Sequence, residues 1–177
     1  MENFNLGDEP FEGSRNFVRT YHYTVSDEVV KNGQHSLKLD YHYGGWVTGN
    51  GAMYANMYPY GQPAPDHVIA DVLPKKLGMW VYSDGSPVPW VRAVVKDGNG
   101  QNKTLNLTSG KQAWNGWRFL EVDIPEDYVT PINLYQIYLV ELDKKIQGDP
   151  NAKGTVYIDD IQWIYNNDLD VKGPEIS

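Results

Sequence analysis

Two neighbouring segments of the chain, LGMWVY and WVRAVV, place large aromatic or basic side chains opposite apolar ones. In an extended strand, successive side chains point to opposite faces. Trp80 and Tyr82 therefore share one face of the first segment, and Trp90 and Arg92 share one face of the second. Aromatic rings next to a guanidinium that donates hydrogen bonds suit a surface that binds a ligand. The same alternation predicts that the opposite, apolar faces belong to the core.

Carboxylates near both ends of the chain could hold a metal ion. In the segment VYIDDIQW, alternation places Asp160 on the same face as Val156 and Ile158, toward the core. A carboxylate at the edge of a core must be paired or bound to a cation. Glu12, beside the first predicted strand, poses the same problem. Two carboxylates together with backbone carbonyls are oxygen ligands of the kind that calcium binds.

The turn NGQHS, just before the segment LKL, could supply those carbonyls, with Gly33 and Ser36 as the predicted contributors. A second interpretation is that Asp160 accepts hydrogen bonds from backbone amides and binds no metal. The residues by themselves favour neither interpretation over the other.

The usual catalytic constellations do not occur in this sequence. The chain has no Gly-x-Ser-x-Gly motif and no Gly-rich phosphate-binding loop before a helix. Its 23 acidic residues offer many pairs, but the separation that defines a glycosidase pair exists only in space. The four histidines show no metal-ligand spacing; they are His22, His35, His42 and His67. We therefore predict no catalytic residue.

Length, charge and cysteine content restrict the class of protein. A chain of 177 residues is long enough for one domain with a substantial core. The net charge of −8 argues against nucleic acid or an anionic membrane as partner, since both require a basic patch. The absence of cysteine excludes disulfides, thiolate catalysis and cysteine-ligated metals. No apolar run approaches the length of a membrane span.

Strand signals dominate the chain, because short alternating or apolar runs are separated by Gly, Pro, Asn and Asp. The segment DGNG at Asp97–Gly100 predicts a hairpin turn, since Gly and Asn tolerate positive φ. Between Asp123 and Tyr135, two prolines limit any helix to one short turn. The predicted strands are 16–23, 36–43, 51–57, 76–83, 90–96, 103–107, 117–124, 134–142 and 154–165.

The order of several motifs resembles that of a known family. Phe11-Glu12-Gly13 is followed by VKNGQHSLKLDY, KLGMWVYSDGS, WVRAVVKDGNGQ, WNGWRFLEVDIP, LYQIYLVE and GTVYIDDI. This ordered set resembles galactose-binding-like β-sandwich carbohydrate-binding modules, most closely the module appended to bacterial phosphodiester glycosidases. The resemblance runs from about Phe11 to Tyr165. Because no segment corresponds to the catalytic domain of the glycosidase, that activity is not implied.

The resemblance implies an all-β, antiparallel jelly-roll β-sandwich of the galactose-binding-like type over residues 1–166. It implies a non-catalytic module that targets an attached enzyme or surface protein to a polysaccharide, in a secreted or cell-surface protein. Such families commonly carry a structural calcium on an N-terminal Glu and a C-terminal Asp, which would be Glu12 and Asp160 here. Residues 167–177 are polar, and we predict that they form a linker or the start of a following module.

Sugar-binding sandwiches stack flat aromatic rings on pyranose rings and bond the hydroxyls with polar side chains. Tyr54, Asn56 and Tyr58 alternate in this way, like the two segments described first. The alternative for Trp80 and Trp90 is a second buried layer, whereas Trp117 and Trp163 are predicted to be core. The predicted sugar contacts are Trp80, Tyr82, Trp90, Arg92, Tyr54 and Tyr58.

Two other functions remain open from the sequence. The fold could serve as a structural or protein-interaction module that has no sugar site. It could also carry a glycosidase or lyase active site, although no motif supports one. Fold analogy does not decide between these functions, because function belongs to the site.

Overall fold

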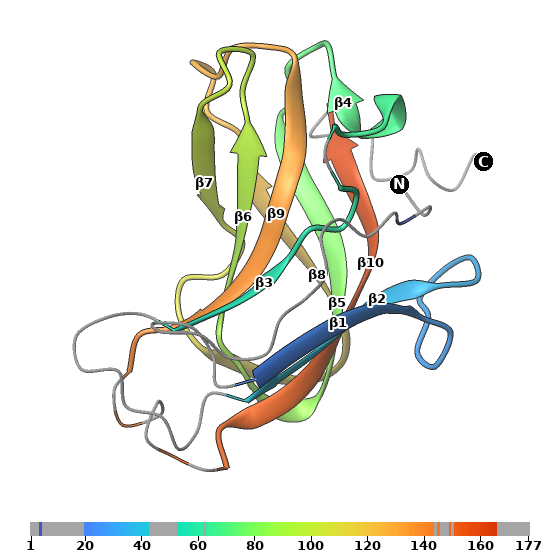
Figure 1. Cartoon of the computed structure of the whole chain (residues 1–177), viewed down its shortest axis with the longest axis vertical. Coiled ribbons are helices and arrows are strands. Elements are labelled where there is room, and N and C mark those ends of the chain that lie inside the picture. Colours follow the sequence, from blue (N-terminus) through green and yellow to red (C-terminus); the bar gives the residue numbers. More distant parts are fainter. Residues whose placement is uncertain are drawn as a thin grey trace.

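The computed structural model describes residues 4, 20–42, 53–61, 63–143, 145, 149 and 151–165. These residues form two antiparallel β-sheets that pack face to face (Figure 1). In this view, strands β6 and β9 of one sheet lie in front of β5 and β8 of the other. The antiparallel β-sandwich predicted from the sequence is confirmed.

The first sheet, sheet A, has the strand order β1-β2-β10-β5-β8. Its central strand β10 pairs with β2 on one side and β5 on the other, so the last strand of the chain joins two early segments. The strands are β1 (Thr20–Ser26), β2 (Ser36–His42), β5 (Lys76–Val88), β8 (Gln112–Asp123) and β10 (Lys153–Ile164).

The second sheet, sheet B, has the order β3-β9-β6-β7, and the short β4 also pairs with β9. A single 3-10 turn, η1 (Asp66–Val68), precedes β4. Among the described residues, no helix is long and apolar enough to cross a membrane. The strands are β3 (Met53–Met57), β4 (Ile69–Ala70), β6 (Trp90–Lys96), β7 (Asn102–Asn106) and β9 (Ile132–Glu141).

The core lies between the two sheets and is built from the apolar rows that alternation predicts. On β5 and β6 these rows are fully buried. Burial of this apolar surface is the main favourable contribution to folding. The inward residues of the two strands are Leu77, Met79 and Val81 on β5, and Val91, Ala93 and Val95 on β6.

The strands largely follow the sequence prediction, with β6 matching it residue for residue. The hairpin between β6 and β7 is confirmed: the Asp97 carboxylate accepts hydrogen bonds from the amides of Asn99 and Gln101, both at 2.9 Å. Gly100 adopts a φ of 74° there. Sequence reasoning missed the two-residue β4 and ended β5 early.

The prediction that Trp117 is core is wrong. On β8, Trp114 and Leu120 point inward, and Trp117 lies three positions from each of them. Alternation along the strand therefore makes Trp117 face outward, where it is half-buried. Trp114 is buried and donates a hydrogen bond from Nε1 to the carbonyl of Val81 at 3.1 Å. Trp163 packs against the core, as predicted.

Candidate functional site

The predicted sugar contacts do not form one surface. Trp80 and Tyr82 lie on the outer face of sheet A, whereas Trp90 and Arg92 lie on the outer face of sheet B. The expectation of a single platform is therefore wrong, because β5 and β6, although consecutive, belong to opposite sheets of the sandwich. Both tryptophans are partly exposed, so neither belongs to a second buried layer.

Trp90 opens β6 and is held by the loop that follows β7. The amide of Val91 donates a hydrogen bond to Thr108 Oγ1 at 2.9 Å, and the carbonyl of Val91 accepts one from the amide of Leu107 at 2.9 Å. Gly110, at a φ of 113°, lies against the indole: a Cβ there would be 3.8 Å from Trp90 Nε1. The loop backbone thus positions the ring at the edge of the outer face of sheet B.

Arg92 lies two residues further along the same face. Its guanidinium carbon is 4.9 Å from the centroid of the Trp90 ring, within the range of a cation–π contact. Its neighbours across the sheet are Tyr138 on β9 and Asn106 on β7. The Nε atom of Arg92 is buried and has no hydrogen-bond partner among the described residues. A buried donor without a partner marks a position where a ligand or water can bind.

A pair of side-chain amides lies next to this cation. Gln136 Nε2 donates a hydrogen bond to Asn56 Oδ1 at 2.6 Å, which joins β9 to β3. Tyr138 is buried between them and Arg92, with 8% of its surface exposed. The sequence placed Asn56 correctly and missed Gln136. It left the side of Tyr138 undetermined, because β9 is apolar on both faces.

A second aromatic and cation pair lies at the far end of β6. The Nζ atom of Lys96 is 4.1 Å from the centroid of the Tyr135 ring. Tyr58 packs against the same ring at 5.5 Å. Tyr54 pairs with Val140 in the β3–β9 register, but its side chain lies outside the described part of the chain.

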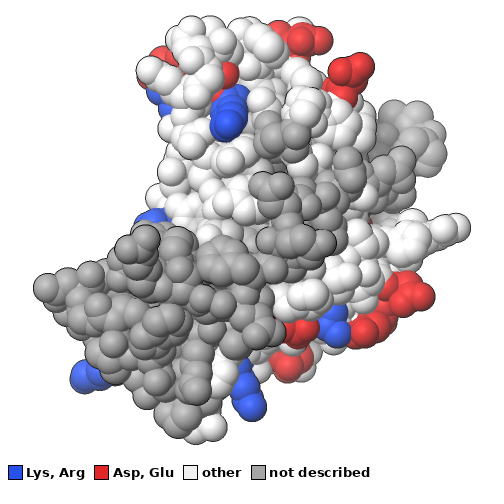
Figure 2. All heavy atoms as spheres, viewed as in Figure 1, with Lys and Arg blue, Asp and Glu red and all other residues white. Residues whose placement is uncertain are grey.

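We call the outward side chains around these two pairs the sheet B face: Asn56, Tyr58, Trp90, Arg92, Lys96, Asn106, Tyr135, Gln136 and Tyr138. Figure 2 views the molecule from this side. The described surface over β6, β7 and β9 is mostly uncoloured, and the acidic side chains gather toward its margins. Aromatic rings, amides and cations thus occur together here in a strongly acidic protein.

The outer face of sheet A carries a ladder of aromatic rings that crosses three strands. Trp80 packs edge-on against Phe119 with ring centroids 5.3 Å apart. Tyr82 packs in the same way against Trp117 at 5.5 Å and Tyr157 at 5.9 Å. Each pair lies directly opposite in register, so these contacts are cross-strand packing of the kind that stabilises sheets.

One ring of this ladder already has a cation on it. Lys31 Nζ, from the turn between β1 and β2, lies 4.4 Å from the centroid of the Trp80 ring. Lys38 on β2 forms an ion pair of 2.8 Å with Glu28, which also accepts a hydrogen bond from the hydroxyl of Tyr157. The rings of the ladder therefore contact charged side chains of the protein itself. On sheet B, by contrast, the Arg92 Nε has no partner among the described residues.

The buried carboxylate of β10 is Asp159, and the prediction that Asp160 points toward the core is wrong. Between the pairs Asp159–Trp80 and Gln162–Gly78, a β-bulge gives β10 one residue more than β5. Asp160 takes the bulge position at a φ of 49° and stays partly exposed, while Ile161 becomes the next core residue. A bulge of this kind re-aims the side chains beside it.

Asp159 is fully buried and accepts three backbone hydrogen bonds. Its Oδ2 accepts from the amides of Lys31 at 2.8 Å and Asn32 at 3.1 Å, and its Oδ1 accepts from the amide of Asp160 at 2.7 Å. The hydrogen bonds from backbone amides that were considered for Asp160 are thus made by its neighbour Asp159. This carboxylate fixes the turn between β1 and β2 against β10.

The predicted metal ligands lie partly within the described residues. The side chain of Asp160 reaches the turn, where its Oδ2 accepts a hydrogen bond from Asn32 Nδ2. Gly33 is exposed at a φ of 71°, and Ser36 is buried, with its hydroxyl donating to the carbonyl of Val29 at 2.6 Å. Glu12 lies outside the described residues. Among those that are described, no three acidic or histidine side chains cluster as a metal site.

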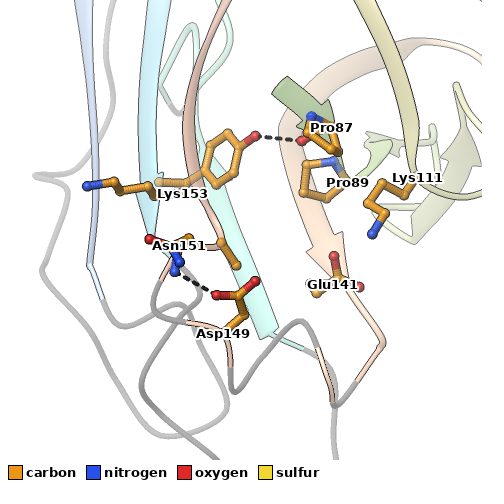
Figure 3. A pocket seen from close by; sticks show the side chains of 9 residues that line it. Pro87, Pro89, Lys111, Glu141, Asp149, Asn151 and Lys153 are labelled. Carbon is orange, nitrogen blue, oxygen red and sulfur yellow. Dashed lines mark hydrogen bonds between the residues drawn. The ribbon is translucent and has the colours of Figure 1, made fainter. Parts of the chain in front are cut away.

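A pocket of about 220 Å³ lies between the ends of the two sheets (Figure 3). The hydroxyl of Tyr41 crosses it and donates to the carbonyl of Pro87 at 3.2 Å. Glu141, at the end of β9, is buried there, and this burial raises the pKa of its carboxyl group. The lining residues are Tyr41, Pro87, Pro89, Lys111, Glu141, Asp149, Asn151, Ala152 and Lys153.

The Glu141→Gln variant is expected to change how stability depends on pH. Burial raises the pKa of Glu141 above its ordinary value of 4.5, so the folded protein binds this proton more tightly than the unfolded chain does. The stability linked to this proton is present below the ordinary pKa and is lost as the pH rises through the raised value. Wild type should therefore lose stability relative to Glu141→Gln across this interval, which urea unfolding at a series of pH values measures. A difference between the two proteins that is constant with pH would contradict this assignment.

The sequence matches no known protein family and no curated protein. Among solved structures, the chain is similar to a carbohydrate-binding module of the β-sandwich superfamily, with 13% identity and a TM-score of 0.52. The match covers 82% of this chain but only 53% of that structure, so the chain spans about half its length. At this identity, the likeness supports a shared β-sandwich fold and not a shared ligand.

Two further structures are similar to this chain. One is a family 11 carbohydrate-binding module from Clostridium thermocellum in complex with a β-1,3-1,4-mixed-linked tetrasaccharide: 16% identity, 92% and 95% of the two chains covered, TM-score 0.46. The other is the CBM22-2 xylan-binding domain from Paenibacillus barcinonensis: 15% identity, 83% and 88% covered, TM-score 0.48.

Proposed function

We propose that this domain is a non-catalytic carbohydrate-binding module whose sugar site is the sheet B face. The observation that supports this most is the Arg92 guanidinium, which stacks on Trp90 while its buried Nε lacks a partner in the described part of the chain. A rotation of the guanidinium would expose this donor to a sugar hydroxyl or ring substituent while the pyranose ring packs on the exposed part of the indole. The Gln136–Asn56 amide pair offers further donors and acceptors beside them.

The aromatic ladder on sheet A is a second candidate surface, favoured by its partly exposed rings at Trp80 and Tyr82. We rank it below the sheet B face. Its rings pack edge-on against each other, and the Lys31 ammonium lies on the face of Trp80. Arg92 lies on Trp90 in the same way, so what distinguishes the sheet B face is the buried Nε of Arg92, which has no partner among the described residues.

In the whole protein, we propose that the module holds an attached enzyme or surface protein near a polysaccharide outside the cell. Its benefit would be a raised effective concentration, so weak binding at a single site would suffice. The closer relationship to the module of bacterial phosphodiester glycosidases stays a prediction from the sequence motifs.

Retardation of the protein in native gels that contain polysaccharide tests this function. We expect slower migration with at least one polysaccharide and no release of reducing ends from it. Release of reducing ends that Glu141→Gln abolishes would instead favour a glycosidase that uses the pocket between the sheets. Unchanged migration with every polysaccharide would favour a structural or protein-interaction module.

We also propose a structural calcium beside the turn between β1 and β2, held by Asp160, Glu12 and carbonyls near Gly33, with Ser36 next to it. The support is that Asp160 reaches Asn32 across this turn. Rotating the Asn32 amide by half a turn would present its oxygen to a cation that Asp160 shares. Asp159 needs no metal, because three amides already satisfy it.

Calcium that binds only the folded state should raise the melting temperature as its concentration increases. We expect a chelator to lower the melting temperature of the protein as purified and calcium to restore it. The Asp160→Asn variant should respond much less to either addition, since it keeps the amide contact geometry and loses one charge. An identical melting curve with and without chelator, together with no calcium by elemental analysis, would rule out the metal.

A further inference from the structure

We propose that the sheet B face selects a sugar that carries an anionic group, either a carboxylate or a sulfate ester. This inference rests on the proposed function, because it names the class of glycan that the same face would take. It follows from the two cations on this face and from how each of them is bound.

Arg92 is the first of these cations. The neighbouring positions on its face are all neutral: Trp90 and Val94 on its own strand, and Tyr138 and Asn106 on the adjacent strands. None of the ion pairs among the described residues includes this arginine. A partly buried guanidinium whose described neighbours are all neutral can gain most from an anionic acceptor, since Arg–carboxylate and Arg–sulfate contacts are charge-assisted and often bidentate.

Three of the four other described lysines on strands have a carboxylate nearby, and the fourth, Lys153, has no ion pair among the described residues. Lys38 pairs with Glu28 at 2.8 Å, Lys76 pairs with Glu121 at 3.0 Å, and Lys103 lies 3.9 Å from Asp97. In an acidic protein a nearby carboxylate is the usual partner of such a cation. Lys38 and Lys103 also lie 5.8 and 5.7 Å from the centroids of tyrosine rings. Arg92 and Lys96 differ in that they contact aromatic rings and have no ion pair among the described residues.

Lys96 repeats the arrangement of Arg92 four residues further along β6. Its ammonium lies on Tyr135 as the Arg92 guanidinium lies on Trp90. Side chains four residues apart on one face of a strand are separated by about 13 Å. The face thus offers two positions along one strand where an aromatic ring and a cation are adjacent. A pyranose ring on the aromatic residue would place a charged substituent beside the cation.

The test compares charged glycans with neutral forms of the same chains. Calorimetry would measure binding to polyuronates (homogalacturonan, alginate and glucuronoxylan) and to their carboxyl-reduced forms, and to dextran sulfate and dextran. We expect at least one anionic form to bind about tenfold tighter than its neutral form, as a charge-assisted contact implies. The polyuronate and sulfate arms show which anionic group is preferred.

Variants of two arginines identify the cause of this preference. Arg92→Gln should remove most of the preference for the anionic form and leave only the part that Lys96 supplies, whereas Arg92→Lys should retain more of it. Arg118→Gln is the matched control on sheet A: Arg118 also lies on a tryptophan, 4.7 Å from the Trp114 ring, and donates to Gln112. This control removes an equal charge and should leave the preference intact. Circular dichroism would confirm that all three variants are folded.

Three results would overturn the inference. Equal binding of neutral and anionic forms, with affinity lost in Trp90→Ala, would reject anionic selection and leave carbohydrate binding in place. A preference that is undiminished in Arg92→Gln would place the selecting cation elsewhere. No binding of any form would count against the proposed function and the inference together.

Discussion

Replacing Asp159 with alanine is expected to cause the largest loss of stability of any single change considered for this domain. Its carboxylate is fully buried and accepts hydrogen bonds from the amides of Lys31, Asn32 and Asp160. Each partly buried amide left without an acceptor costs about 1–3 kcal/mol, so the loss should reach about 3–5 kcal/mol. The free energy of unfolding of native proteins is only about 5–15 kcal/mol, so the variant should be marginally stable at physiological temperature.

Urea unfolding of Asp159→Ala in the presence of a chelator measures this loss without a contribution from bound calcium. The matched control is Asp160→Asn, which changes the adjacent, partly exposed carboxylate and keeps a side chain that tolerates the positive φ at this position. The free energy of unfolding of this control should lie within about 0.5 kcal/mol of that of wild type. Equal losses in the two variants would mean that the bulge, and not the Asp159 carboxylate, holds the turn.

Trp90→Ala should produce the largest loss of polysaccharide affinity. The indole is partly exposed on the sheet B face and supports the Arg92 guanidinium. Removing an aromatic residue that anchors a ligand typically costs about 1–3 kcal/mol, or about 5- to 150-fold in affinity. Stability should change less than binding, because part of the ring contacts solvent in the free protein.

Trp80→Ala is the matched control for that prediction, since it removes the same ring type from the opposite sheet. It should leave polysaccharide affinity unchanged and reduce stability, because the ring packs on Phe119 and carries Lys31. Isothermal titration calorimetry of both variants measures the change in affinity, and thermal unfolding measures the change in stability. Lost affinity in Trp80→Ala with none lost in Trp90→Ala would move the site to the aromatic ladder.

Alternation along regular strands explains how much of the fold could be predicted. Leu77, Met79 and Val81 alternate with Trp80 and Tyr82 in the sequence, and the structure buries the first set completely. The pattern depends on the residues of one strand alone. For the same reason, the boundaries of β6 and the turn at Asp97–Gly100 followed directly from the sequence.

Bulges account for the errors at individual sites. A strict period of two placed Asp160 in the core, but one extra residue in β10 left Asp160 partly exposed and made Ile161 the next core residue. Asp159 is buried because the turn between β1 and β2 covers it, which the sequence of β10 does not show. Bulges depend on pairing with a neighbouring strand, so one strand's sequence does not reveal them. Tyr138 is a different case: β9 is apolar on both faces, so its sequence did not show to which side the ring points.

The split of the predicted sugar platform has a different cause. The sequence shows which residues share a face of β5 and which share a face of β6. It does not show that the chain crosses from sheet A to sheet B between Val88 and Trp90, through the single residue Pro89. Strands that follow each other in the chain usually pair or lie side by side in one sheet. The separation of Trp80 from Trp90 is therefore a property of the tertiary structure.

The central claim, that sugar binds on the sheet B face, can be tested most directly by nuclear magnetic resonance. Each of the six tryptophans contributes one indole N–H signal. On titration with an oligosaccharide from a polysaccharide that retards the protein, the Trp90 indole signal should shift, together with the Gln136 and Asn56 side-chain amide signals. The indole signals of Trp80 and Trp117 should stay in place. Shifts confined to Trp80 and Trp117 would contradict this account and assign sugar binding to sheet A.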